Sequence, residues 1–526
     1  MFSRRVIALA TVTMLAVALA PASEASAAAA TATPRWGACP PPAPGGVPRD
    51  ERQQCATLSL PLDYRRPDGR QITVTISRIR TAQPGTRLGI LLSNPGGPGG
   101  SGLDLPSYLA TALPAEVLAR YDLIGFDPRG VGASTPITCG LGPETPIELV
   151  LPYPAPDGSI SRNVEFARTT ARSCAALSGD LIPYITTANT ARDMDRIRAA
   201  LGEQKLSYLG YSYGTYLGAV YTSLFPGRSD RIILDSAVDP NRIWYDIWRQ
   251  FSPAVALRFP DFAAWAAARH DVYGLGTTPE AVTQTYFATA AALDREPVVT
   301  PDLTITGNVF REITRSYLYD DRNFPSLAEI WQALSQSAAP ADGTVLRTRT
   351  GKARADVPFD NSQAVLWAIA CDDIAWSRNV GGYARNSAAD RKRFPITAGM
   401  PPNIWPCAFW PYRPIEPPVA VTGNGPRNVL VLQNLRDPAT GWESGFGLRQ
   451  ALNSRAAMVT QDAGGHGIYG IRSGPCAAEI ATAFLVTGVL PGRDRFCPGP
   501  SPDDISTMAG LPPIPASPLG LTVGGG

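Results

Sequence analysis

The sequence Gly210-Tyr211-Ser212-Tyr213-Gly214 lies between a short apolar segment, residues 206–209, and a second apolar segment that begins at Thr215. Glycines two residues before and two residues after a serine let the chain turn sharply from a strand into a helix. Such a turn exposes the serine, whose hydroxyl can then act as a nucleophile. The pattern G-x-S-x-G is weak evidence by itself, because about 0.3 copies are expected by chance in a chain of this composition.

A serine hydroxyl needs a base to remove its proton, and the chain has only two histidines, His270 and His466. His466 stands in the loop Gly464-Gly465-His466-Gly467, after a strand-like segment at 457–460. His270 ends an alanine-rich and aromatic segment, 262–270, that is typical of a helix. Because a lone histidine on a helix usually packs or caps, we predict a structural role for His270 and assign the base to His466.

An acid that orients the imidazole is expected between the serine and the histidine in the chain. Asp437 follows the β-branched, apolar segment 428–433 and so stands at the carboxyl end of a predicted strand, where open parallel sheets bind ligands. An aspartate before a proline, here Pro438, is also a common turn residue. The chain order Ser212, Asp437, His466 favours the catalytic interpretation.

A glycine-rich loop, residues 94–102 (NPGGPGGSG), follows the short apolar segment 89–93. Closely spaced glycines let backbone N–H groups approach a bound oxyanion without obstruction by side chains. A flexible loop and a phosphate-binding loop are the alternatives, and the absence of a Lys-Ser/Thr pair after these glycines disfavours the phosphate-binding loop. We predict that the amides of Gly97 and Tyr213 form an oxyanion hole.

Together with the segments DLIGFDPRGVGAS (122–134), RDPAT (436–440) and GGHG, these motifs resemble those of the secreted tripeptidyl aminopeptidases. That family is related to the proline iminopeptidases within the α/β-hydrolases, and the resemblance covers nearly all of the mature chain. It implies a mostly parallel central sheet flanked by helices, with Ser212 as nucleophile, Asp437 as acid and His466 as base. It also implies cleavage of short peptides from a free N-terminus. Gly441 stands where the family's D-P-x-T-P has its second proline, a small departure.

The chain is long enough for a large core with an inserted domain. After the apolar strand that ends at Asp235, a segment rich in Ala and Trp with helical spacing extends to Asn428, and we interpret it as a cap. The predicted regions are a signal peptide (1–27), the first part of an α/β-hydrolase core (36–240), a mainly helical cap (241–424), the second part of the core (425–497) and a tail rich in Pro and Gly (498–526).

The first residues have the composition of an export signal. Arg4 and Arg5 precede an apolar run, 6–20, and Ala25-Ser26-Ala27 offers a cleavage site. The run is too short and too rich in Ala to span a membrane stably. Two arginines fit both an ordinary secretory leader and a twin-arginine signal, so the export route stays open. No later segment is typical of a membrane span.

The eight cysteines suit an exported protein with disulfides. They fall into neighbours along the chain, and proximity suggests the pairs Cys39–Cys55, Cys139–Cys174, Cys371–Cys407 and Cys476–Cys497. No C-x-x-C or His-rich spacing indicates a metal site, and no motif indicates a cofactor. A net charge of +2 with 17% charged residues gives no sign of a nucleic-acid partner.

The predicted cap should determine specificity, because an aminopeptidase must bind the substrate ammonium with carboxylates. Asp372 and Asp373 are the candidates, and Asp373 matches the last position of a similar A-I-x-C-x-D run in the family. Two neighbouring aspartates are more often a solvated helix end. Several cap aromatics could line a pocket, although core packing is the commoner role: Trp244, Tyr245, Trp248 and Trp376.

Local patterns also predict individual elements. A hairpin is expected from 56–62 and 71–79, and a strand from Tyr121 to Phe126. An amphipathic helix is expected to begin at Thr190, which would cap it, and to end at Gly202.

Three functions remain compatible with these observations. The first is an exported serine aminopeptidase that acts on peptide or protein N-termini. The second is a carboxylic ester hydrolase with the same three residues, which would need no free amine on its substrate. The third is a non-catalytic binding protein, against which the intact Ser212, Asp437 and His466 argue. Residue preference, the length of the peptide removed and the oligomeric state stay open.

Overall fold

The computed structural model describes residues 33–42, 48–300, 303–336 and 356–500. The predicted signal peptide, 1–27, and residues 501–526 of the predicted tail lie outside the described residues. Among the described helices, none has the length and apolar character needed to cross a membrane.

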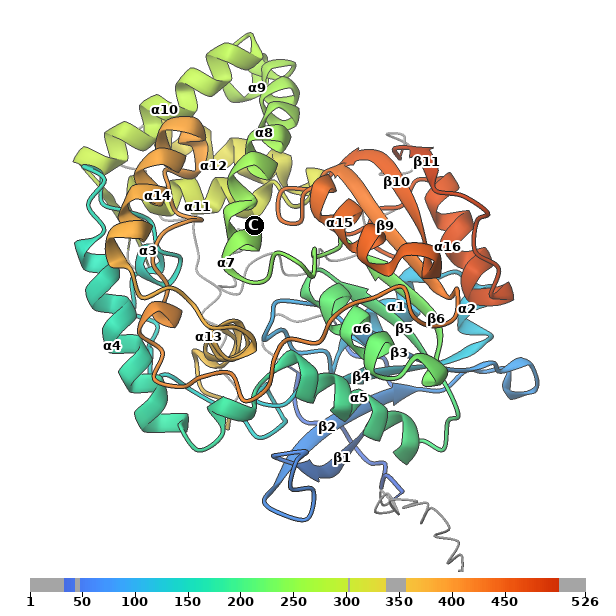
Figure 1. The fold of residues 1–526 in the computed structure, drawn as a ribbon. Coiled ribbons are helices and arrows are strands. Elements are labelled where there is room, and N and C mark those ends of the chain that lie inside the picture. Colours follow the sequence, from blue (N-terminus) through green and yellow to red (C-terminus); the bar gives the residue numbers. More distant parts are fainter. Residues whose placement is uncertain (1–32, 43–47, 301–302, 337–355, 501–526) are drawn as a thin grey trace, which may run out of the picture.

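A twisted, mostly parallel sheet of nine strands forms the centre of the molecule (Figure 1), in the order β1-β2-β4-β3-β5-β6-β9-β10-β11. Only β2 runs against its neighbours, pairing antiparallel with both β1 and β4. The strands are β1 (Gln54–Pro61), β2 (Gln71–Ile79), β3 (Gly89–Asn94), β4 (Tyr121–Phe126), β5 (Leu206–Tyr211), β6 (Ser229–Asp235), β9 (Val429–Arg436), β10 (Ala456–Gly464) and β11 (Arg495–Pro498).

Alternate residues of the central strands enter two different hydrophobic clusters, one on each face of the sheet. In β6, Ile232 and Leu234 pack on the face covered by α5, α6 and α15, whereas Ile233 packs on the face covered by α1, α2 and α16. This alternation follows from the two-residue period of a strand. The flanking helices are α1 (Leu105–Ala112), α2 (Ala115–Leu118), α5 (Thr187–Ala200), α6 (Tyr213–Leu224), α15 (Trp442–Leu452) and α16 (Pro475–Thr487).

The segment between β6 and β9 adds a layer of helices beside the sheet (Figure 1). Four of these helices, α8, α10, α11 and α12, surround a hydrophobic cluster of their own, separate from the two clusters of the sheet. The elements of this insertion are α7 (Tyr245–Arg249), α8 (Phe251–Ala267), α9 (His270–Tyr273), α10 (Pro279–Arg295), β7 (Val298–Val299), β8 (Thr304–Ile305), α11 (Gly307–Tyr317), α12 (Phe324–Gln336), α13 (Asn361–Asp373) and α14 (Val380–Arg393).

The inner part of the insertion belongs to the core instead. Residues of α7 and α13 pack in the same cluster as α5 and α6. Twelve of the thirteen residues of α13 are buried, so it is a fully enclosed helix rather than an amphipathic surface helix. Two further helices, α3 (Ile147–Val150) and α4 (Ser161–Ser178), come from the segment before β5 and lie beside the insertion in Figure 1.

Several predictions from local patterns can be compared with this fold. The hairpin is confirmed as β1 and β2, and the strand Tyr121–Phe126 as β4. The prediction that Thr190 is the N-cap residue of its helix is wrong. Helix α5 begins one turn earlier, and the Thr186 side chain accepts the capping hydrogen bond from the Asn189 amide. Thr190 lies inside the helix and donates to the carbonyl of Thr186 instead.

All four predicted cysteine pairs are confirmed as disulfides, Cys39–Cys55, Cys139–Cys174, Cys371–Cys407 and Cys476–Cys497. Each joins cysteines 16 to 36 residues apart in the chain. Four disulfides are consistent with an exported protein.

Candidate active site

Ser212 occupies the tight turn between β5 and α6, with a positive φ of 55°. This conformation is strained for a residue other than glycine and is held by the surroundings. The Ser212 amide donates to the carbonyl of Asp235 on β6 at 3.0 Å. A Cβ on Gly210 would lie 2.5 Å from the carbonyl oxygen of Gly214, so the turn needs a glycine there, and a Cβ on Gly214 would lie 2.9 Å from the carbonyl oxygen of Asn94 on β3.

The glycine-rich loop after β3 lies directly against this turn. A Cβ on Gly96 would be 2.6 Å from the Tyr211 carbonyl oxygen, 2.8 Å from Ser212 Cβ and 3.3 Å from the Tyr213 nitrogen. Tyr213 is the first residue of α6, where the N–H groups of the first turn have no acceptor within the helix. The loop that carries Gly97 and the amide of Tyr213 are therefore brought to the same side of Ser212.

Asp437 and His466 are in direct contact. His466 Nδ1 lies 2.9 Å from both carboxylate oxygens of Asp437, whose side chain is fully buried. The same carboxylate accepts from the amides of Ala439 and Thr440 at 2.8 and 3.0 Å, and from the Thr440 hydroxyl. These bonds fix the carboxylate, and they leave Nε2 as the imidazole nitrogen that does not face Asp437.

A residue of the insertion between β6 and β9, Tyr319, also contacts His466. The His466 amide donates to the Tyr319 carbonyl at 2.8 Å, and the two rings meet edge to face with centroids 5.1 Å apart. A Cβ on Gly465 would lie 2.8 Å from the same carbonyl, so the glycine before the histidine permits this approach. The imidazole is thus held between the sheet edge and the insertion.

The other histidine, His270, has a different setting. It is the first residue of the short helix α9 in the insertion, and its Nδ1 accepts from the amide of Gly276 at 3.1 Å. This bond closes a turn, as predicted for a structural histidine.

Asp372 and Asp373 end α13 and are both buried, so the prediction that they might form a solvated helix end is wrong. Asp373 accepts from the Thr187 amide at 2.8 Å, the Thr187 hydroxyl at 2.6 Å and Trp244 Nε1 at 3.1 Å. Burial raises its pKa to about 6, against the effect of these donors. Asp372 accepts from Trp410 Nε1, and burial raises its pKa well above the usual value.

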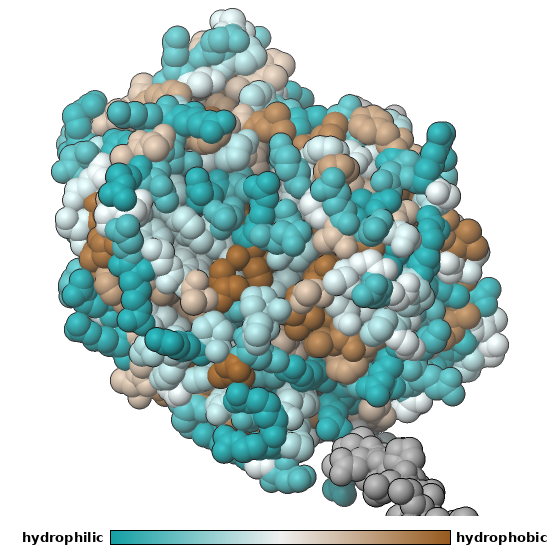
Figure 2. Space-filling view, viewed as in Figure 1, coloured by the Kyte–Doolittle hydropathy of each residue, from teal (hydrophilic) through white to brown (hydrophobic). Residues whose placement is uncertain are grey.

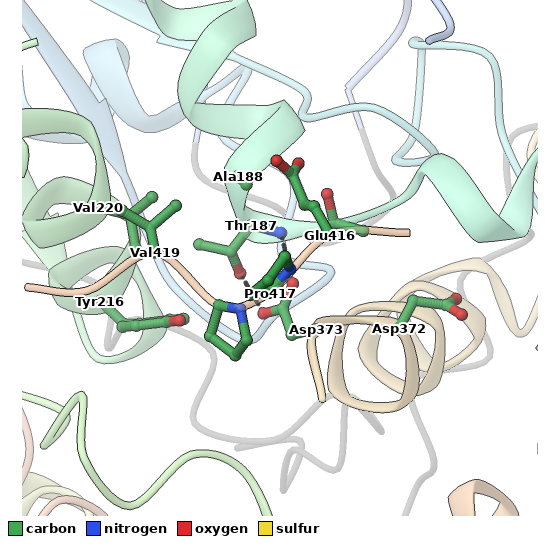
Figure 3. A pocket seen from close by; sticks show the side chains of 11 residues that line it. Thr187, Ala188, Tyr216, Val220, Asp372, Asp373, Glu416, Pro417 and Val419 are labelled. Carbon is green, nitrogen blue, oxygen red and sulfur yellow. Dashed lines mark hydrogen bonds between the residues drawn. The ribbon is translucent and has the colours of Figure 1, made fainter. Parts of the chain in front are cut away.

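Both aspartates line a pocket between α5, α6, α13 and the segment 416–419 (Figure 3). In this view the carboxylate of Asp373 points toward Thr187, whereas that of Asp372 points away from it. A third carboxylate in the lining, Glu416, forms a two-pronged ion pair with Arg192. Figure 2 shows hydrophobic side chains near the centre of the face of the molecule that is seen in Figure 1.

The predicted cap aromatics mostly pack. Trp244, Trp248 and Trp376 are buried and Tyr245 is partly buried, all in the cluster around α6 and α13. Trp244 nevertheless contacts the site, because its ring meets Tyr213 with centroids 5.7 Å apart while its indole nitrogen bonds to Asp373.

Sequence analysis assigned no site role to Asp235, Tyr319 or Thr187. A signal for Asp235 was present, since it stands at the carboxyl end of a parallel strand, as do Ser212 and Asp437. Tyr319 and Thr187 have no such signal, because their contacts with His466 and Asp373 join segments distant in the chain.

Comparison with known proteins decides the family. Residues 396–497, which include Asp437 and His466, match the family described as TAP-like protein. Over 465 residues the chain is 37% identical to a tripeptidyl aminopeptidase of Streptomyces lividans, covering 84% of this chain and 83% of the relative. The chain belongs to the tripeptidyl aminopeptidase family.

Two further relatives of this member of the tripeptidyl aminopeptidase family are named as a serine protease and as a carboxylesterase. The chain is 31% identical over 464 residues to the serine protease Hip1 of Mycobacterium bovis, covering 84% of this chain and 87% of the relative. It is 29% identical over 459 residues to a carboxylesterase B of Mycobacterium tuberculosis, covering 84% and 86%. As a member of the family, the protein is a serine hydrolase with the α/β-hydrolase fold.

Proposed function

We propose that the protein is an exported serine exopeptidase that releases tripeptides from free N-termini. The observation that carries the proposal is the bonded pair Asp437–His466 at the sheet edge where Ser212 occupies its strained turn. The tripeptidyl aminopeptidase relative supports the substrate class.

In this mechanism His466 Nε2 takes the proton of Ser212 as the hydroxyl attacks the scissile carbonyl carbon. Asp437 holds Nδ1 and stabilises the imidazolium that forms. The amides of Gly97 and Tyr213 donate to the oxyanion. His466 then gives the proton to the leaving amine, and a water molecule attacks the acyl-enzyme in the same way to release the peptide.

The substrate ammonium is assigned to Asp373. Among the described residues, no arginine or lysine forms an ion pair with this buried carboxylate. A buried charge without a counter-ion is costly, so the site favours a bound cation that supplies one. Asp372, its neighbour in the pocket lining, adds negative potential if it ionises, but it faces Trp410.

The connection between Asp373 and Ser212 suggests a short peptide rather than a single amino acid. Thr187 Oγ1 bonds to Asp373 and lies 3.0 Å from the hydroxyl of Tyr213, the residue after Ser212. This chain of contacts, a tyrosine side chain plus two hydrogen bonds, sets an upper limit on the separation of the two groups that leaves room for a short peptide. A single residue places its ammonium within about 3.5 Å of its carbonyl carbon, whereas three extended residues span about 10 Å.

The test is hydrolysis of four matched chromogenic substrates: a free tripeptide amide, its N-acetylated form, a single amino-acid amide and an aryl ester. Cleavage of the free tripeptide alone among the amides is expected. Equal cleavage of the acetylated form would contradict an ammonium-binding exopeptidase. Cleavage of only the ester would favour the alternative, a carboxylic ester hydrolase, which the relative named carboxylesterase B supports.

A further inference from the structure

Asp235, the last residue of β6, is a fully buried carboxylate that the mechanism above does not use. Its two oxygens each lie 3.0 Å from the amide of Ile468, and one accepts from the amide of Tyr469 at 2.7 Å. The hydroxyl of Ser236 accepts from the amide of Gly467 at 2.7 Å. Three successive N–H groups after His466 thus converge on the end of one strand.

The same residue also contacts the turn that carries the nucleophile. The carbonyl of Asp235 accepts from the amide of Ser212 at 3.0 Å, and Asp235 pairs in register with Tyr211 on one side and Leu432 on the other. Its backbone is therefore bonded to the Ser212 turn, and its side chain to the loop that follows His466.

A carboxylate suits this position because it only accepts hydrogen bonds. An asparagine of the same shape would present N–H donors to amides that are themselves donors, and at least one bond would be lost. The arrangement has a cost, since none of the described residues provides a lysine or arginine partner and burial raises the pKa of Asp235 to about 7. A buried carboxyl without a cationic lysine or arginine partner, held by two backbone amides, indicates that anchoring this loop matters.

We propose that Asp235, assisted by Ser236, is a positioning residue that holds His466 at a fixed place relative to Ser212. The inference rests on the proposed function, in which Ser212 and His466 exchange a proton. Asp235 acts through the backbone of residues 467–469 and does not touch the reacting atoms.

The decisive variant is Asp235→Asn, compared with the matched control Asp360→Asn. Asp360 is also buried and also accepts two backbone amides and a hydroxyl, from Cys139, Leu141 and Thr138, so it anchors a different loop, residues 138–141. A purely structural effect should be similar in both variants. Thermal unfolding of each variant measures that effect.

Two readouts separate positioning from stability. One is the rate at which a fluorophosphonate probe labels Ser212, which needs the base but no particular substrate. The other is the NMR spectrum of protein labelled with ¹⁵N-histidine, in which His270 serves as an internal reference. In Asp235→Asn we expect labelling and kcat to fall at least tenfold with KM changed less than twofold, and the ring signals of His466 to shift while those of His270 do not.

Unchanged labelling and an unchanged His466 signal in Asp235→Asn, or an equal loss in Asp360→Asn, would overturn the inference. Should Asp235→Asn fail to fold, Ser236→Gly replaces it. Ser236 has a φ of 59°, which glycine adopts freely, so this variant removes the hydroxyl while relieving the backbone. A several-fold slower labelling with a shifted His466 signal is expected, and wild-type values for both would contradict the inference.

Ser212→Ala separates a failure of the proposed function from a failure of the role proposed for Asp235. If this variant keeps its activity, the proposed function itself is wrong. If it is inactive while Asp235→Asn behaves like the wild type, only the role of Asp235 is refuted.

Discussion

The carboxyl edge of the sheet and the helical insertion each hold a buried aspartate, but the two carboxylates are partnered in opposite ways. Asp437 at the sheet edge meets an imidazole and backbone amides that belong to its own or the next strand's loop. Asp373 in the insertion meets Thr187 and Trp244, which come from two other segments of the chain. The ends of neighbouring strands position Asp437 and His466 at the sheet edge. The proposed specificity residue, Asp373, is positioned by packing between segments that are distant in the chain.

The largest loss of activity is expected from a change at the carboxyl edge of the sheet. Ser212→Ala should lower kcat by roughly four to six orders of magnitude, because no other group can form the acyl-enzyme. The melting temperature should stay close to that of the wild type or rise, since the strained turn loses only a hydroxyl. Substrate hydrolysis and thermal unfolding measure the two, and retained turnover would exclude Ser212 as nucleophile.

A smaller loss is expected from the glycine loop. Gly96→Ala would place a methyl group 2.8 Å from Ser212 Cβ at a φ of +98°, which should displace the oxyanion donors and lower kcat about 10²-fold. Gly227→Ala is the control, because nothing lies within 4 Å of its Cβ position. Similar kinetics for both variants would show that the loop does not shape the oxyanion hole.

In the insertion, Asp373→Asn should lower kcat/KM for a free tripeptide amide about 10- to 100-fold, which is the value of a charge-assisted hydrogen bond. Hydrolysis of the aryl ester, which carries no ammonium group, should change little. Asp372→Asn should have a smaller effect, because the carboxylate faces Trp410 and burial already favours its neutral form. An equal loss on the free tripeptide amide and the aryl ester would mean that Asp373 supports the fold and not the ammonium.

The smallest expected effect concerns stability and pH. Burial raises the pKa of Asp390, which accepts from Ser252, to about 6. Between about pH 4 and 6 the folded protein therefore keeps a proton that the unfolded chain has released, so this group's contribution to stability is lost as pH rises. In Asp390→Asn, the melting temperature at pH 5 minus that at pH 8 should therefore be smaller than in the wild type. An unchanged value would contradict the raised pKa.

The sequence predicted best those features that depend on residues close together in the chain. The strand before Ser212 and the helix after it, the β4 strand and the four disulfides follow from short-range patterns, and they are found as predicted. The N-terminus of α5 was misplaced by one turn because Thr186 and Thr190 are both suitable caps and tertiary packing chooses between them. Tyr319 and Thr187 could not be found, since only the folded chain brings them to His466 and Asp373.

The short spacing of the disulfides also has a consequence for biogenesis. For a chain that is exported unfolded, each cysteine pair can close as soon as its own segment of 16 to 36 residues has emerged from the translocation channel. The hydrolytic machinery must wait much longer, because the glycine loop and His466 stand near opposite ends of the described chain. Three of the four disulfides can thus form before His466 has emerged, whereas Cys476–Cys497 lies beyond it, so a partly oxidised and still inactive chain is the expected species while such export proceeds.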